Sequence, residues 1–232
     1  MTLLDATDEA RVDDWVASRM YKDQSCVAVF PTRGTIPARV YDSHMSMMRL
    51  PNQKFTMVTV ANMEVSAAYE WAASNVLGDP ELSTWRWMLT LEEDNIIPPD
   101  GMLKLIKAAD VGGFDILGGL YWVKGEGGCP QIWGDRTDPV ENYRSQPPDR
   151  DGGIVECWGT GMGFTLFSVE LLRSLGAPRF LVDAETDGCF TQDLKFCSRA
   201  HAWAKTVGRT LKIGVDCSVK VGHLDVSTGV IW

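Results

Sequence analysis

Three consecutive carboxylates, Glu92, Glu93 and Asp94, directly follow an apolar run that ends at Leu91. Adjacent carboxylates repel one another, and a bound cation relieves that repulsion. Side chains alternate along an extended chain, so we expect Glu92 and Asp94 on one side and Glu93 on the other. Hard oxygen ligands of this kind suit Mn²⁺ or Mg²⁺, particularly where a diphosphate supplies further oxygens. The run predicts a divalent-metal site, and a solvated acidic turn is the alternative.

Other side chains that could do chemistry lie in polar segments elsewhere in the chain. Asp193 stands at the start of an expected helix, either as a general base for a hydroxyl group or as a complement to the helix dipole. Asp187 is a second candidate for the base. His223 follows the run SVKVG and is either a metal ligand or a structural residue. Arg33, in PTRGTIP, is available to a phosphate, although a plain surface turn would have the same composition.

The segment WGTGMG, residues 158–163, carries glycines at alternate positions. Such a segment lets the backbone approach a ligand closely, but tight packing of one strand on another would need the same residues. It has neither the ending of a phosphate-binding loop nor the spacing of a dinucleotide-binding motif. The preceding aromatic side chain, Trp158, favours a sugar site.

These residues need a scaffold that brings them together, and the alternation of predicted elements supplies one. Apolar runs rich in β-prone residues alternate with helical periodicity, which is typical of an α/β sheet with crossover helices. In open sheets of this class ligands bind beyond the carboxyl ends of the strands, where the three carboxylates lie. The predicted strands cover about 25–30, 55–60, 83–91, 114–123, 154–158, 163–168 and 210–216, and the predicted helices about 38–49, 62–77, 100–110, 169–176 and 191–207.

Length and composition predict one globular domain over residues 1–232, with a long loop at 124–153 that is either a lid or a surface excursion. The 22 Lys and Arg residues against 31 Asp and Glu residues give a formal charge of −9, which disfavours broad, nonspecific nucleic-acid binding. Six cysteines without a CxxC pair argue against a zinc module and a disulfide framework. No apolar run is long enough for a membrane anchor, and the acidic N-terminus is unlike a secretion signal, so we expect a cytoplasmic protein.

Four segments, taken in order, resemble the family of GT-A fold nucleotide-sugar glycosyltransferases, and most closely its family 2-like members. LEEDNIIPPD resembles the metal-binding DxD segment, and FDILGGLYW resembles the strand that follows the next helix. TGMGFTLFSVELLRSLG resembles the glycine-rich turn and helix at the sugar and acceptor site. TQDLKFCSRA and VKVGH resemble the acidic helix start and the terminal metal-ligand histidine. The likeness covers about residues 25–224.

The resemblance implies a GT-A-like, Rossmann-type mixed sheet flanked by helices in a single domain. It assigns about 25–123 to the nucleotide sugar and metal, and about 124–232 to the acceptor and catalysis. Two departures concern the metal geometry and the base: Glu92 replaces an aspartate, and Gln192 precedes Asp193 where an acid is usual. The implied roles are metal binding for Glu92, Asp94 and His223, donor binding for Pro31, Thr32, Arg33, Asn62 and Glu93, acceptor binding for Trp158, Gly159, Thr160, Gly161 and Gln192, and general-base catalysis for Asp193.

The resulting expectation is a Mn²⁺- or Mg²⁺-dependent transfer of sugar from a nucleoside-diphosphate sugar, with a UDP-sugar as the expected donor. Direct attack would invert the anomeric carbon, although retaining enzymes share the fold. The expected acceptor is a glycan or a hydroxylated base in phage DNA, since similar compact enzymes occur in bacteriophages and act in the host cytoplasm. Two alternatives stay open: a nucleotidyltransferase that consumes a nucleoside triphosphate, and a non-catalytic sugar-binding protein.

Overall fold

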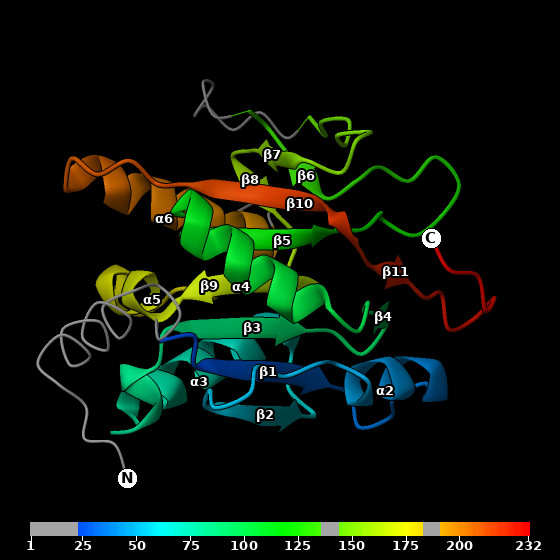
Figure 1. Cartoon of the computed structure of the whole chain (residues 1–232), viewed down its shortest axis with the longest axis horizontal. Helices are drawn as coiled ribbons and strands as arrows, with labels where there is room; N and C mark the ends of the chain where they lie inside the picture. Colours follow the sequence, from blue (N-terminus) through cyan, green and yellow to red (C-terminus); the bar gives the residue numbers. More distant parts are fainter. Residues whose placement is uncertain (1–22, 136–143, 183–190) are drawn as a thin grey trace, which may run out of the picture.

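A seven-stranded mixed sheet forms the centre of the computed structural model, which describes residues 23–135, 144–182 and 191–232 (Figure 1). The strand order is β2-β1-β3-β9-β5-β10-β7. The α/β class expected from the sequence is therefore confirmed. In sequence order the strands of this sheet are β1 (Cys26–Thr32), β2 (Phe55–Ala61), β3 (Trp87–Leu91), β5 (Ile116–Leu120), β7 (Ile154–Glu156), β9 (Phe164–Ser168) and β10 (Ile213–Lys220).

Strand β9 lies in the middle of the sheet and runs against both of its neighbours. It pairs antiparallel with β3 on one side and with β5 on the other, while β1 pairs parallel with β2 and β3, and β5 pairs parallel with β10. The carboxyl ends of β1, β2, β3, β5 and β10 therefore share one edge of the sheet (Figure 1). Because β9 and β10 come from the second half of the chain, the halves 25–123 and 124–232 interleave in one sheet.

Helices cover both faces of this sheet. On one face lie α3 (Val65–Gly78), α5 (Val169–Leu175) and α6 (Gln192–Thr206), and on the other lies α4 (Gly101–Gly112). Each face of the sheet packs against its helices in a hydrophobic core of its own. The run CVAVF in β1 is apolar throughout because its side chains point alternately into these two cores. Two further helical segments are α2 (Ala38–Met45) and the 3₁₀ turn η2 (Leu82–Thr84).

Two short strand pairs tie the loops to this framework. Strand β4 (Asn95–Ile96) pairs antiparallel with β11 (Gly222–His223), which sets His223 opposite Asn95. Strand β6 (Ile132–Trp133) pairs with β8 (Gly159–Thr160), so this part of the predicted 124–153 loop is attached to the body of the protein. Residues 136–143 of that loop lie outside the described part of the chain, and the lid remains a prediction.

Several predicted elements are shorter in the structure. The helix expected over 38–49 ends at Met45, and the strand expected over 114–123 ends at Leu120. The helix expected from 62 begins at Val65, because the Glu64 side chain accepts a hydrogen bond from the Ala67 amide at 3.0 Å and so caps the first turn.

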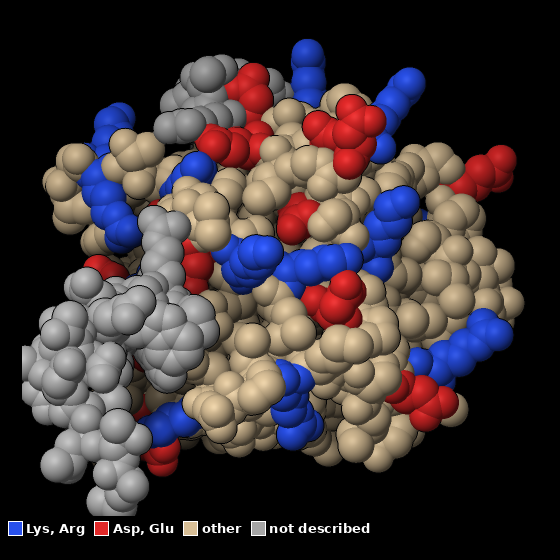
Figure 2. Space-filling model, viewed as in Figure 1, with Lys and Arg blue, Asp and Glu red and all other residues tan. Residues whose placement is uncertain are grey.

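The surface of the described residues carries both signs of charge. On the face shown in Figure 2, Lys and Arg side chains and Asp and Glu side chains are scattered among uncharged residues, and neither sign forms a continuous patch. Among the described residues, no helix combines the length and apolar character that crossing a bilayer requires.

Candidate functional site

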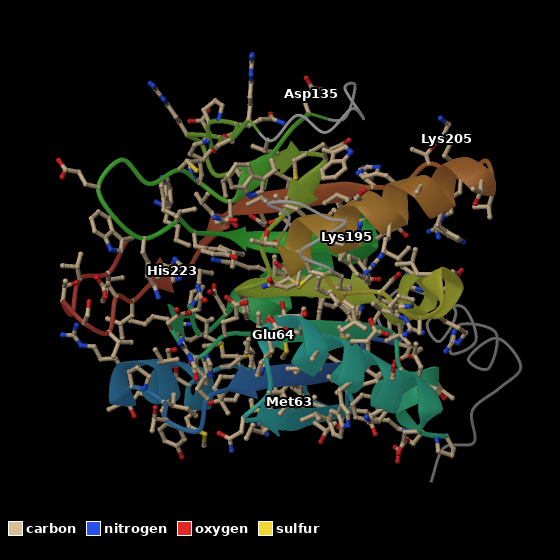
Figure 3. All side chains as sticks on the ribbon, turned by 180° about the vertical axis from the view of Figure 1, so that it is seen from behind. Met63, Glu64, Asp135, Lys195, Lys205 and His223 are labelled. Carbon is tan, nitrogen blue, oxygen red and sulfur yellow. The ribbon has the colours of Figure 1, made fainter. Side chains whose placement is uncertain are left out.

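A cavity of about 440 Å³ lies at the carboxyl edge of the sheet and collects most of the predicted donor and metal residues. Its walls come from the ends of β1 and β3, the junction between β2 and α3, and the start of α6. Figure 3 shows Met63 and Glu64 at the β2–α3 junction, on the same side of the sheet as α6. The lining residues are Pro31, Thr32, Arg33, Met63, Glu64, Val65, Glu92, Glu93, Asp94 and Gln192.

The three carboxylates lie in a turn just after β3, and each side chain has a different partner. Strand β3 ends at Leu91, and the Asn95 amide closes the turn by donating to the Glu92 carbonyl at 3.2 Å. The simple alternation expected for an extended chain therefore does not describe the turn. Its irregular backbone sends Glu92, Glu93 and Asp94 towards three separate groups of residues.

Glu93 fixes the loop that follows β1. Its carboxylate accepts hydrogen bonds from the Thr32 hydroxyl at 2.9 Å, the Arg33 amide at 2.8 Å and the Arg33 Nε at 2.5 Å. Burial alone would raise the pKa of Glu93, but these hydrogen bonds outweigh it and hold the pKa below its ordinary value. Glu93 is therefore an ionised anchor for the cavity wall, and its direct contact with a donor remains a prediction.

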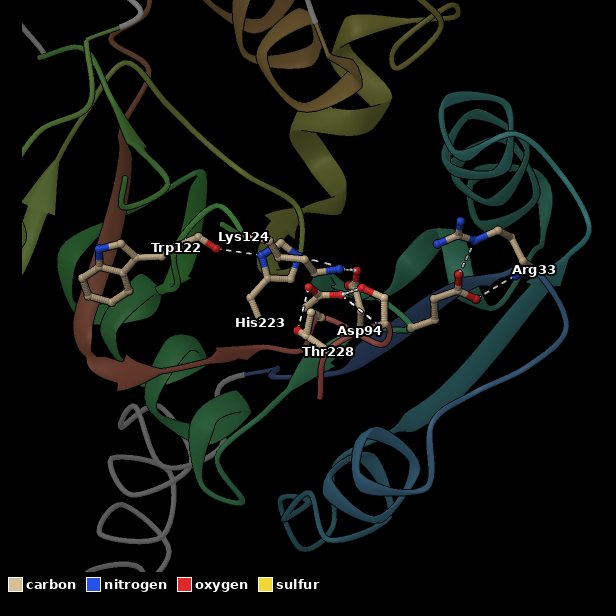
Figure 4. Close-up of polar contacts among 9 residues, drawn as sticks. Arg33, Asp94, Trp122, Lys124, His223 and Thr228 are labelled. Atoms are coloured by element: carbon tan, nitrogen blue, oxygen red, sulfur yellow. Dashed lines mark hydrogen bonds and ion pairs between the residues drawn. The ribbon is translucent and has the colours of Figure 1, made fainter. Parts of the chain in front are cut away.

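Asp94 is the point where the C-terminal segment meets β3 (Figure 4). The Asp94 carboxylate forms an ion pair with Lys124, and its Oδ2 lies 3.5 Å from His223 Nε2. The other ring nitrogen of His223, Nδ1, lies 2.7 Å from the Trp122 carbonyl oxygen. Burial acts to raise the pKa of Asp94, but the contacts with His223 and Lys124 prevail, so the pKa lies below its ordinary value and Asp94 is ionised.

Glu92 lies at the inner wall of the cavity, where the protein crowds around its carboxyl group. The Tyr69 hydroxyl, on α3, lies 3.2 Å from Glu92 Oε1. Burial, followed by the charges of Asp94 and Asp193, raises the pKa of Glu92 to about 8. Glu92 therefore holds its proton at neutral pH in the protein without ligands.

Asp193 lies in the first turn of α6 and hydrogen-bonds to its own helix. Its carboxylate accepts from the Thr191 hydroxyl and from the Leu194 amide, the latter at 2.8 Å. Burial raises the pKa of Asp193 above its ordinary value against these hydrogen bonds. Gln192, beside it, lines the cavity, whereas Asp193 does not. Asp187 lies outside the described residues.

The glycine-rich segment is packed inside the protein and does not line the cavity. The Trp158 ring is stacked on His201 with the ring centroids 5.0 Å apart, and only 2% of Trp158 is exposed. The buried Thr160 hydroxyl donates to the Gln131 carbonyl at 3.1 Å. A Cβ atom on Gly159 would touch α6, and one on Gly161 would lie 2.1 Å from the Tyr121 hydroxyl oxygen. These glycines therefore allow close packing, and an exposed Trp158 face for a sugar is absent from this conformation.

Asn62 lies beside the cavity without lining it. Its backbone is left-handed, with φ of 61°, and its amide donates to the Thr32 carbonyl at 2.9 Å, which joins the ends of β1 and β2. The other two histidines, His44 on α2 and His201 on α6, each lie within hydrogen-bond distance of a backbone carbonyl, that of Asn95 and that of Trp158 respectively.

The donor set at Asp94 fits a divalent ion that takes part of its coordination from a ligand. Because the Trp122 carbonyl can only accept, His223 Nδ1 carries the hydrogen, and in the neutral imidazole the Nε2 lone pair faces the Asp94 carboxylate. A neutral His223 and Asp94 would thus offer one nitrogen and one carboxylate ligand, at the position that the Lys124 ammonium occupies here. Within the described part of the chain, no group of three or more His, Cys, Asp or Glu side chains is arranged to hold a metal ion.

Tyr69, Trp122 and Lys124 are site residues that the sequence analysis missed. Tyr69 is fully buried at a core position of α3, so helical periodicity marks it as packing and gives no sign of its hydroxyl contact. Lys124 is separated from Asp94 by 30 positions, and strand β9 lies between the two strands that they follow. A lysine directly after the apolar run LGGLYWV, at the same sheet edge as the carboxylates, was the available signal.

Comparisons with known proteins give structural likeness without sequence likeness. No family model matches the chain, and no curated protein matches it significantly. The structure is similar to that of A197 from STIV, with a TM-score of 0.61 and 18% identity over 87% of this chain and 86% of that chain. It is also similar to S. aureus TarS, with a TM-score of 0.51 and 11% identity over 85% of this chain but only 36% of that chain. At these identities the likeness establishes the fold, which is a mixed, Rossmann-like sheet of the GT-A kind.

Proposed function

We propose that this chain is a divalent-metal-dependent glycosyltransferase, which transfers a sugar from a nucleoside-diphosphate sugar to an acceptor hydroxyl, with a UDP-sugar as the expected donor. The observation that carries the proposal is the meeting of Asp94 and His223 beside a cavity lined by the expected donor residues. The GT-A-like fold supports it, because ligands of open α/β sheets bind at this edge.

Asp94 and His223 would hold Mn²⁺ or Mg²⁺, and Glu92 would contribute through water or directly after losing its proton. The metal supplies Lewis-acid stabilisation of the charge on the nucleoside-diphosphate leaving group. The Trp122 carbonyl orients His223 by holding Nδ1, and such partners commonly raise metal affinity by about 10- to 100-fold.

The nucleotide would occupy the cavity between the β1 loop and the β2–α3 junction. Glu93 holds Thr32 and Arg33 in place through three hydrogen bonds, so the loop is ordered before the donor binds. The Arg33 side chain is 83% exposed, and its guanidinium group keeps N–H donors available for a phosphate group.

Asp193 would accept the proton of the acceptor hydroxyl while that oxygen attacks the anomeric carbon and the bond to the diphosphate breaks. Its raised pKa brings the carboxylate closer to neutral pH, which suits a general base. A carboxylate has about four acceptor positions, so its bonds to Thr191 and Leu194 leave room for a hydroxyl. Direct attack gives inversion, and Gln192 in the cavity wall would contact the acceptor.

The proposed acceptor is a glycan or a hydroxylated base in DNA. The charge of −9 and the mixed charges on the visible face favour the glycan, because affinity for DNA depends on clustered cations.

A thermal-shift experiment tests the proposal. UDP with Mn²⁺ at about 100 times its Kd should stabilise the wild-type protein by about 2.7 kcal/mol, which corresponds to about 5 to 10 °C in Tm. Asp94→Asn should stay folded in EDTA with a lower Tm, because its ion pair with Lys124 is lost. The variant should lose the shift on adding UDP and Mn²⁺, and reduce metal-dependent transfer by about two orders of magnitude, since about 3 kcal/mol of transition-state stabilisation disappears. Normal turnover by the variant, together with no effect of EDTA on the wild type, would rule the proposal out.

A non-catalytic sugar-binding protein is the second candidate, and two observations favour it. Gln192 stands where a second acid is usual, and the Asp193 carboxylate is held by its own helix. Slow hydrolysis of a UDP-sugar in the presence of Mn²⁺ would identify an enzyme, whereas a thermal shift without any hydrolysis or transfer would identify the binding protein.

A further inference from the structure

We propose that Lys124 is an internal counter-ion of the metal position: its ammonium group neutralises Asp94 in the protein without ligands, and moves to the donor diphosphate when a divalent ion binds. This inference rests on the proposed function, since it assumes a metal and a diphosphate at the same edge of the sheet. It adds a residue for which the family resemblance gave no role.

The contact itself places Lys124 in competition with a metal ion. The Lys124 ammonium pairs with Asp94 Oδ2, and the same oxygen faces His223 Nε2 at 3.5 Å. Figure 4 shows Lys124 and His223 approaching Asp94 together. A divalent ion held by Asp94 and His223 would lie against the ammonium group, and two cations at such a distance repel strongly. Lys124 therefore has to leave when the ion binds.

Lys124 is also placed to move. Its side chain is 31% exposed and has a flexible four-carbon stem, and it lies just beyond Trp122, whose carbonyl holds His223. It lines a second cavity, of about 670 Å³, which shares Arg33, Glu93 and Asp94 with the first cavity. The ammonium can thus swing into this space while its backbone stays in place.

The second cavity contains two cations that neighbouring carboxylates hold. Glu93 pairs with Arg33, and Asp94 pairs with Lys124. Both cations line the wall next to the proposed metal position. A diphosphate that enters between them provides a new counter-ion for Lys124. The diphosphate thus makes it easier for the metal to displace Lys124 from Asp94, and the metal frees Lys124 to bind the diphosphate. The physical consequence is positive coupling between the two ligands, which by linkage is reciprocal.

Titrations with Mn²⁺, in the presence and absence of UDP, test this coupling. The loss of the EPR signal of free Mn²⁺ measures the amount bound. Lys124→Gln removes the competing cation, so it should bind Mn²⁺ alone about tenfold more tightly than the wild type, and the factor by which UDP strengthens Mn²⁺ binding should fall about tenfold. Lys124→Arg keeps the charge and should resemble the wild type. Lys104→Gln removes a lysine of α4 that forms an exposed ion pair with Asp100, and serves as the matched control, with no change in either value.

Opposite changes in the two titrations distinguish this role from a structural one, because a loosened site would weaken both. Equal Mn²⁺ affinity in Lys124→Gln and the wild type, or an unchanged effect of UDP, would overturn the inference while the proposed function stands. Tighter Mn²⁺ binding by Lys124→Arg as well would also overturn it, because the charge would then not be the cause. A wild-type protein that binds no Mn²⁺ even with UDP would reject both proposals. Circular dichroism melting in EDTA checks that all variants are folded.

Discussion

Glu92 is a carboxyl group whose proton contributes to the stability of the folded chain. Its pKa of about 8 lies well above the ordinary value of 4.5, because burial and the charges of Asp94 and Asp193 disfavour the anion. Between these two pH values the unfolded chain releases the proton and the folded chain keeps it. The contribution is complete below about pH 4.5 and is lost as the pH rises through about 8.

Glu92→Gln should remove this pH dependence, since glutamine has no proton to lose and its carbonyl can still accept from Tyr69. In EDTA, the free energy of unfolding of the wild type should fall from pH 5 to pH 8 by about 1 to 3 kcal/mol relative to the variant. The full pKa shift would give more, but the side chain keeps some contact with water through the cavity. Urea unfolding at the two pH values measures the difference. Parallel pH profiles for the two proteins would show that Glu92 is ionised when folded.

At the scale of elements, the turn between β8 and β9 depends on the absence of a side chain at Gly161. A Cβ atom there would lie 2.1 Å from the Tyr121 hydroxyl oxygen and 2.9 Å from Gln131 Oε1. The Tyr121 hydroxyl also accepts from the Gly163 amide at 2.9 Å, so it cannot move without losing that bond. Close packing, and not ligand contact, is the function that the structure shows for this glycine.

Gly161→Ala should therefore destabilise the protein by about 1 to 3 kcal/mol, the usual range for overpacking a filled site. Gly78→Ala is the matched control, because Gly78 ends α3 and nothing lies within 4 Å of its added Cβ atom. This control should be neutral or up to about 1 kcal/mol more stable, because alanine favours helix. Urea midpoints provide both values, and equal midpoints for the two variants would contradict the packing argument.

The sequence was sufficient for the seven strands of the central sheet, its main helices and the edge of the sheet where the site lies, because apolar periodicity and residues such as proline and glycine report local structure. The short strands β4, β6, β8 and β11 and the turn η2 were not predicted. Burial of alternate side chains in two cores explains why β1 could be recognised from CVAVF alone. The partners of Glu92 and Asp94 could not be found in this way. Tyr69 and Lys124 reach them through tertiary packing, and the position of Lys124 depends on where β9 enters the sheet.

Trp158 shows that composition alone does not reveal whether an aromatic side chain is exposed. An aromatic residue before alternating glycines has the composition of a sugar site, yet the ring stacks on His201 within the protein. Glycine permits close approach of any neighbour, so composition alone does not distinguish a ligand from another part of the chain.

At the scale of the whole molecule, one continuous sheet should make the chain unfold as a unit. Strand β5, from the first half of the sequence, pairs with β9 and β10, both from the second half. We therefore expect coincident urea transitions by far-UV circular dichroism, which reports the helices, and by tryptophan fluorescence, which reports nine tryptophans spread along the chain, among them Trp87 and Trp158. A fragment ending at residue 123 should remain unfolded. Two separated transitions, or a folded fragment, would show that the halves are independent.

The central position of β9 also determines when the protein can fold during its synthesis. The ribosome makes β3 and β5 long before Phe164–Ser168, the segment that must insert between them, and β10 follows later still. Until then the nascent chain exposes unpaired strand edges and apolar faces, which are prone to aggregate. Expression at low temperature or with a chaperone that shields such edges should thus raise the yield of native protein.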